Sequence, residues 1–302
     1  MIVQRTWKPT LLLGFSLALM ACGGGGTDTT GAGNGADTLD TTAGSTKQGG
    51  LVKVGGKLFN VPSPVETAVL IHRSGIAYDK GLPLPLEQGD AATTKSARAL
   101  ALGIYGADLA YVTIQKDGQR ALSTMQAIEK LGTALEVSNA FDRALVERFK
   151  GNLTNEDSLL RMSGEAFRSA DAYLKNNERD DVSALVLAGG WIEGMHLLLG
   201  GTGKLPAELA QRVGEQKRTL GDLIALLEQS DKEKTLGSLV DGLKDLASVY
   251  AGITTTYQYE APVTDVPGKT THINSKSAVT ITDDQIKSIA GKLAALRTSI
   301  LA

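Results

Sequence analysis

The sequence predicts an all-α protein, either a multi-helix bundle or a stacked array of helix pairs, with about nine helices. Apolar residues recur at spacings of three and four, as in the stripe Leu239, Leu243, Leu246 and Tyr250, and this is the period of an amphipathic helix. The gaps between such stripes are mostly short, as between antiparallel neighbours in a bundle. Helix start signals agree with the stripes, for example Pro206 at a first turn.

In chain order, the expected helices cover residues 63–73, 94–115, 119–135, 139–150, 155–176, 178–199, 206–229, 232–256 and 283–301. The first begins at Ser63 and Pro64 and stops before Gly75, and the last follows Thr282 and Asp283. Two segments depart from this pattern. Residues 81–86 alternate Leu with Pro and cannot be helical, so we expect an ordered loop with its leucines packed inward. Residues 257–280 are rich in Thr and Val around a Pro-Gly turn, which fits a short β-hairpin laid across the helices or a hydrophilic loop.

Two of the expected helices are apolar nearly all round, which predicts that they form the buried centre of the domain. Between residues 97 and 114 the only fully charged groups are Arg98 and Asp108, and between 183 and 199 the only ionisable ones are Glu193 and His196. Both helices carry mid-helix glycines, each costing about 1 kcal/mol relative to Ala. The glycines therefore indicate either close approach of two helix backbones or the lining of a cavity.

Asp108 and Glu193 are the main chemical question, because an unpaired buried carboxylate costs several kcal/mol and must find a partner or take up a proton. One interpretation pairs each acid with Arg, His or Tyr from a neighbouring helix. The other makes the two acids the floor of a ligand pocket, whose further residues would be Tyr105, Tyr111, Trp191 and His196.

Glu193 and His196 also form Glu-x-x-His, a spacing that di-iron bundles use, but the sequence has no second such pair and we predict no metal site. The segments around Asp108 and Glu193 align at a constant offset of 85 residues, which fits either a duplicated helical unit or two buried helices with similar demands.

No catalytic residues and no cofactor are predicted. The chain lacks a Gly-x-Ser-x-Gly elbow, a His-Glu-x-x-His pair, a phosphate loop and a dinucleotide fingerprint. Its histidines lie at positions 72, 196 and 272, and none has a recognisable nucleophile beside it in the sequence.

The N-terminus has the form of an export signal. Arg5 and Lys8 precede an apolar run from Leu11 to Met20, which is too short to span a bilayer. The run ends in Leu-Met-Ala-Cys at residues 19–22, which resembles the lipobox of bacterial lipoproteins. The resemblance implies that residues 1–21 are removed and that Cys22 carries a covalent diacylglycerol, with acyl chains such as palmitate anchoring it stably. An ordinary secretory signal that ends near a cysteine is the alternative.

The resemblance also bears on location. Gly23 stands where Asp would commonly signal retention in the inner membrane, so we expect the outer membrane, facing the periplasm or the surface, if the source is Gram-negative. Residues 22–50 are mostly Gly, Thr, Ala and Asp and predict a flexible tether with a reach of about 25–30 Å. Residues 51–302 then form a single α-helical domain.

The charge of the chain without residues 1–21 is −4, because 29 basic and 33 acidic residues remain. This balance gives no basic surface for nucleic acid, so the expected partners are the membrane and an envelope protein or small ligand. With Cys22 lipidated, there is no thiol left for a disulfide or a thiolate metal site.

The body of the chain also resembles uncharacterised, all-helical exported lipoproteins, in the segments Gly103–Asp108 and Gly190–Gly194. That resemblance implies location and fold but no activity. Three functions remain open: a non-enzymatic binding or scaffold lipoprotein of the envelope, which we favour; a periplasmic enzyme or metal- or ligand-handling protein built on Asp108, Glu193 and His196; and a helical-repeat adaptor.

Overall fold

The computed structural model describes residues 50–54, 57–61, 64–138, 176–200 and 204–300, together with scattered positions between 147 and 174. Backbone contacts divide the chain between Thr46 and Lys47, and every described element belongs to the second part. The predicted signal sequence, Cys22 and nearly all of the predicted tether lie outside the described residues, as do most of the predicted helices 139–150 and 155–176.

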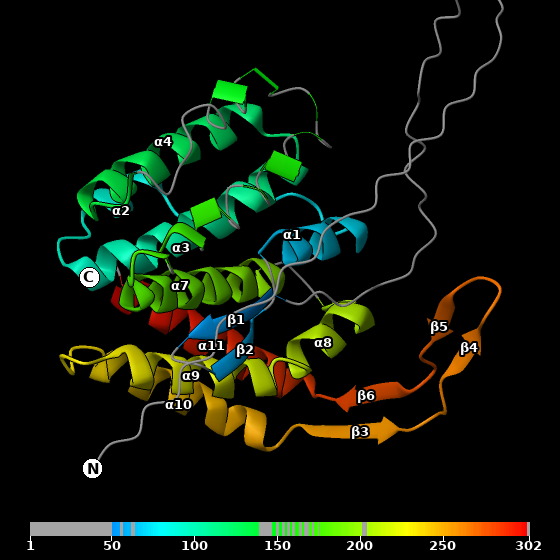
Figure 1. The fold of residues 1–302 in the computed structure, drawn as a ribbon. Coiled ribbons are helices and arrows are strands. Elements are labelled where there is room, and N and C mark those ends of the chain that lie inside the picture. The colour runs from blue at the N-terminus through cyan, green and yellow to red at the C-terminus, as the bar shows by residue number, and fades with distance from the viewer. Residues whose placement is uncertain are drawn as a thin grey trace, which may run out of the picture. The chain divides into compact units, whose positions relative to one another are not determined.

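The all-α prediction is confirmed (Figure 1). The helices of the described residues are α1 (Pro64–Arg73), α2 (Leu86–Asp90), α3 (Lys95–Ile114), α4 (Gly118–Ala134), α7 (Asp180–Leu199), α8 (Ala207–Gly214), α9 (Lys217–Ser230), α10 (Gly237–Ala251) and α11 (Asp283–Ile300). The strands are β1 (Gly50–Val54), β2 (Lys57–Val61), β3 (Thr254–Gln258), β4 (Val263–Asp265), β5 (Thr270–His272) and β6 (Lys276–Thr280).

Several predicted boundaries were wrong for local reasons. The predicted helix 206–229 is two helices, interrupted after Gly214, and glycine is unfavourable in a helix interior. A glycine is needed there because a Cβ atom would lie 2.2 Å from Cγ1 of Val279. The predicted helix 232–256 begins only at Gly237, because the Asp231 carboxylate accepts the backbone N–H groups of Thr235 and Leu236. It ends before Thr254, where β-branched residues continue as a strand.

Helices α3 and α7 form the centre of the fold, as predicted. Almost all of their residues from Ala99 to Ile114 and from Val182 to Leu198 are buried. Helices α1 and α11 each contact both α3 and α7. Helix α4 packs against α3, and α9 packs against α7. Helix α10 in turn packs on α9 and α11. By length and composition α7 alone among the described helices could cross a membrane, but 78% of its most apolar window is buried inside the domain, so it serves as a core helix.

Two glycines explain how α3 and α7 come so close. A Cβ atom on Gly103 would lie 2.0 Å from the carbonyl oxygen of Val186, and one on Gly189 would lie 2.1 Å from that of Leu100. No side chain fits at these distances, so the helix backbones themselves are in contact. Of the two interpretations of the mid-helix glycines, close backbone approach holds for Gly103 and Gly189.

The predicted β-hairpin is present but does not lie across the helices. Strand β3 pairs antiparallel with β6, and further out β4 pairs with β5, so that residues 254–280 form one interrupted two-stranded ribbon, here called the β arm. All residues of β3, β4 and β5 are exposed, and in Figure 1 the β4–β5 part turns away from the line of β3–β6. A second, unpredicted hairpin is formed by β1 and β2, and β2 contacts α9.

Candidate functional site

The two acids singled out in the sequence face one another across the α3–α7 contact. The helices run parallel, because Lys95 and Asp181 are paired at 2.5 Å where both helices begin and Asp108 and Glu193 interact further along. Asp108 and Glu193 are both 0% exposed. The 85-residue offset in the sequence thus corresponds to two parallel helices that place an acid at matching depth.

Glu193 is paired with an arginine from a distant helix. Nε of Arg297 on α11 lies 2.5 Å from one carboxylate oxygen of Glu193, and Nη2 lies 2.9 Å from the other. This two-point geometry is the strong form of the ion pair. The side chain of Arg297 is only 16% exposed, so the pair is largely removed from water. Arg297 thus compensates the charge of Glu193, in agreement with the interpretation that pairs this acid with an arginine from a neighbouring helix.

No cation in the described part of the chain forms an ion pair with Asp108, whose Oδ2 instead accepts the backbone N–H of Leu84 at 2.9 Å. Burial raises the pKa of Asp108 well above its ordinary value, and the neighbouring Glu193 carboxylate raises it further. Among the described residues, Oδ1 of Asp108 has no hydrogen-bond partner. Burial and the nearby Glu193 carboxylate thus both favour the uncharged form of Asp108.

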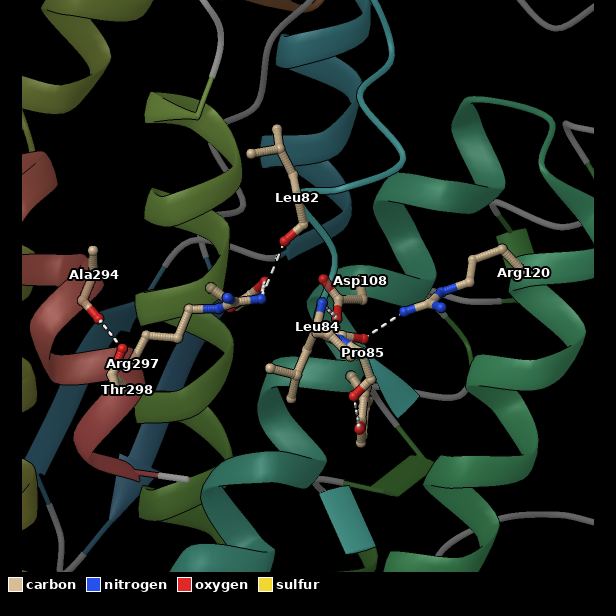
Figure 2. Close-up of polar contacts among 10 residues, drawn as sticks. Leu82, Leu84, Pro85, Asp108, Arg120, Ala294, Arg297 and Thr298 are labelled. Carbon is tan, nitrogen blue, oxygen red and sulfur yellow. Dashed lines mark hydrogen bonds and ion pairs between the residues drawn. The ribbon is translucent and has the colours of Figure 1, made fainter. Parts of the chain in front are cut away.

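The same cluster holds the loop of alternating Leu and Pro residues in place (Figure 2). Arg297 donates through Nη2 to the carbonyl oxygen of Leu82 at 3.1 Å, and Arg120 on α4 donates to that of Leu84. Leu84 itself is fully buried, as predicted for an inward-packed leucine. Prolines supply no N–H groups, so this backbone cannot satisfy itself as a helix would, and side chains from α3, α4 and α11 do so instead.

Tyr105, another predicted ligand residue, also binds this loop. Its hydroxyl accepts the N–H of Gly89 at 2.9 Å and lies 2.9 and 3.0 Å from the carbonyl oxygens of Pro85 and Leu86. Burial raises the pKa of Tyr105 to about 12, so the hydroxyl stays a donor at any physiological pH. Gly89 is required beside it, because a Cβ atom there would lie 2.4 Å from the tyrosine ring.

The remaining tyrosine of the predicted pocket, Tyr111, is fully buried and accepts the backbone N–H of Asp79 at 3.3 Å. Its ring packs against that of Tyr78, with centroids 5.4 Å apart. Tyr78 in turn donates to the Asp117 carboxylate at 3.0 Å. These contacts fix the start of the same loop, so the tyrosines continue the structural pattern set by the acids.

His196 and Trp191 occupy different surroundings. His196 is half-buried near Glu193 and Arg297 and donates to the backbone of Leu82; burial lowers its pKa, and the Glu193 charge opposes that effect. Trp191 does not join this cluster, because its indole N–H donates to the Gln216 side chain at 3.2 Å. Trp191, Gly190 and Gly194 border a hollow of about 10 Å³, which has room for no more than one water molecule.

Arg297 and Arg120 belong to the cluster but were not predicted from the sequence. Each lies on or next to the apolar stripe of its helix: Arg297 is four residues after Leu293, and Arg120 is four residues before Thr124, and both of these neighbours are buried. A basic residue on a buried stripe was the available signal for a partner of the buried acids.

Within the described part of the chain, no group of three or more His, Cys, Asp or Glu side chains converges as metal ligands would. No protein-family model matches this chain, and no curated protein or solved structure is similar to it. The site is therefore interpreted from its geometry alone: the acids, tyrosines and arginines around α3 and α7 bind an internal segment, residues 79–91.

Proposed function

We propose that this chain is a lipid-anchored, non-enzymatic binding or scaffold protein of the bacterial envelope, attached through Cys22. One observation carries the non-enzymatic part: the polar side chains that the sequence offered for chemistry are engaged with one another and with the loop backbone. Glu193 is held at both oxygens by Arg297, and Asp108 by Leu84. Groups held in this way serve to position the loop.

The anchoring part of the proposal is supported by the sequence at residues 19–22 and by the composition of the tether. It is tested by growing bacteria that express the chain with an alkyne-bearing palmitate analogue. We expect the wild-type chain to incorporate the label, Cys22→Ala to lose it, and the matched control Met20→Ala to keep it, since small residues fit that position. Equal labelling of wild type and Cys22→Ala would refute the anchor.

A ligand-handling protein built on Asp108, Glu193 and His196 is the competing proposal, and Glu193→Gln separates the two. If the acid is structural, replacing it leaves Arg297 buried without a counter-charge, and the midpoint of thermal unfolding falls markedly. If Glu193 is held for a ligand, the variant keeps the wild-type melting temperature and helicity. A Glu193→Gln protein as stable as wild type would therefore count against the scaffold proposal.

A further inference from the structure

The exposed apolar side chains of this domain are concentrated in one place. In the part of the chain whose side chains the structure describes, the large hydrophobic residues that are well exposed all belong to the β arm: Tyr257, Tyr259, Val263, Val266 and Ile273, each between 58% and 79% exposed. Elsewhere the described helices bury such residues in one core. An apolar group confined to one projecting element marks an interaction surface.

The backbone of the arm is also incomplete as a sheet. Within the described residues, strand β3 pairs only with β6, and β4 only with β5. Each part is therefore a two-stranded ribbon, which is marginally stable by itself in water. Strand β3 and Tyr259, which follows it, consist of Thr, Tyr and Gln, without charge, Gly or Pro. Protein edges that avoid association normally carry charges, prolines or bulges, and this edge carries none of them.

The two edges of the ribbon differ. The β6 edge lies against α8: Gln211 donates to the carbonyl oxygen of Ser277 at 3.4 Å, and Val279 packs over Gly214. Among the strands that the structure describes, none lies beside the outer edge of β3. In an antiparallel pair of strands, two residues that lie opposite each other either both direct their N–H and C=O groups to the partner strand or both direct them away from it. Ser277 faces outward to Gln211, so its partner Tyr257 directs its backbone groups to the open edge.

We propose that two copies of this chain associate through the outer edges of their β3 strands, forming a four-stranded antiparallel sheet with Tyr257 of each copy opposite the other at a two-fold axis. Thr255 of one copy then lies opposite Tyr259 of the other. Tyr257, Tyr259 and Val279 belong to the same face of the ribbon, because Thr255 pairs with Val279 and alternate residues share a face. Tyr257 and Tyr259 of both copies thus lie on one face of the joined sheet.

A second copy fits this edge because the edge is complementary to itself. In the stated register the nearest charge, Glu260, lies opposite Thr254, so no like charges face one another at the contact. Elsewhere the excess of acidic residues opposes association of two identical chains, so the uncharged strand is where two copies approach at least cost. A strand pairing antiparallel with its own copy makes a closed two-fold contact, which ends at a dimer and does not propagate.

The register is tested with single cysteines in the full-length protein in native membranes. Residues opposite each other in a hydrogen-bonded pair have Cα atoms about 5.5 Å apart, within the range for a disulfide. Under mild oxidation we expect Tyr257→Cys to give a covalent dimer. Tyr259→Cys is the matched control, because its two copies would be roughly 14 Å apart at about 3.4 Å per residue along the strands. Cys22 is retained in both variants, and the parent chain supplies the background.

Equal cross-linking of the two cysteine variants, or none at Tyr257→Cys, would overturn the proposal. A second measurement does not depend on cross-linking: the molar mass of the detergent-solubilised full-length protein. We expect wild type at the mass of a dimer, Tyr257→Lys at that of a monomer because two lysines would oppose each other, and Val266→Lys still dimeric. A monomeric wild type would refute the dimer. Loss of the dimer in Val266→Lys as well would show that the apolar tip, rather than the β3 edge, makes the contact.

Discussion

The buried α3–α7 centre and the exposed β arm use similar residue types in opposite ways. In the centre, tyrosine hydroxyls, an aspartate and an arginine satisfy the backbone of the loop between α1 and α3, and two helix backbones touch at Gly103 and Gly189. In the arm, Tyr257 and Tyr259 are exposed to solvent, and no described strand pairs with the outer edge of β3. Stability is therefore expected to reside in the centre, and association in the arm.

The largest effect expected from this comparison is at the buried ion pair. Arg297→Met removes the counter-charge of Glu193, which is 0% exposed, and an uncompensated buried charge costs about 3–5 kcal/mol. Lys292→Met, on the same helix, is the control, because the pair of Lys292 with Asp245 is open to solvent and such pairs contribute about 0–1 kcal/mol. Denaturant unfolding of both variants measures the difference, and equal losses would show that the Glu193 pair is not structurally critical.

The glycines at the helix contact give the next largest effect. Gly189→Ala places a Cβ atom 2.1 Å from the Leu100 carbonyl oxygen, so the helices must separate, at a cost of about 1–3 kcal/mol. Gly291→Ala on α11 is the control: its Cβ atom would meet nothing within 4 Å, and helix propensity alone predicts a gain of up to about 1 kcal/mol. Opposite signs in thermal unfolding are expected. A Gly189→Ala protein as stable as Gly291→Ala would contradict the close approach.

The helical part of this fold was predictable from the sequence because periodicity is a local signal. The stripes of α10 and α11 and the nearly uniform apolarity of α3 and α7 indicated which helices would be amphipathic and which central. The hairpin of β1 and β2 was missed, although its alternating residues flank Gly55-Gly56, a recognised hairpin signal. Helix ends were missed where a single side chain decides them, as Asp231 does for α10.

The site was predictable only in part, because pairing is a long-range property. The sequence indicated that Asp108 and Glu193 are buried and need partners. It could not place Arg297, which is 104 residues from Glu193 in the chain. It also could not place the backbone of Leu84, which needs a donor and an acceptor only because the neighbouring prolines exclude a helix. Trp191 was grouped with the acids because it shares their helix, but its indole points to Gln216 instead.

A smaller effect is expected for the tyrosine that holds the loop. Tyr105→Phe removes the acceptor of the Gly89 N–H and the donor to the carbonyl oxygens of Pro85 and Leu86, and we expect a loss of about 1–2 kcal/mol. Tyr257→Phe in the arm should change stability by less than about 0.5 kcal/mol, because that side chain is 65% exposed. Hydrogen exchange of residues 79–91 provides a local readout, with faster exchange expected in Tyr105→Phe only.

The effect that depends most strongly on pH is expected for Asp108→Asn. The pKa of Asp108 is raised in the folded protein, so the folded state binds more protons than the unfolded state above about pH 4. The stabilising contribution of protonated Asp108 is complete below that pH and is lost as the pH rises through the folded-state pKa. Asparagine keeps an acceptor for the Leu84 N–H and a donor to Glu193 without titrating. In denaturant unfolding, the wild type should therefore lose stability relative to Asp108→Asn as the pH rises above about 4, whereas a constant difference would mean that folding does not raise the pKa of Asp108.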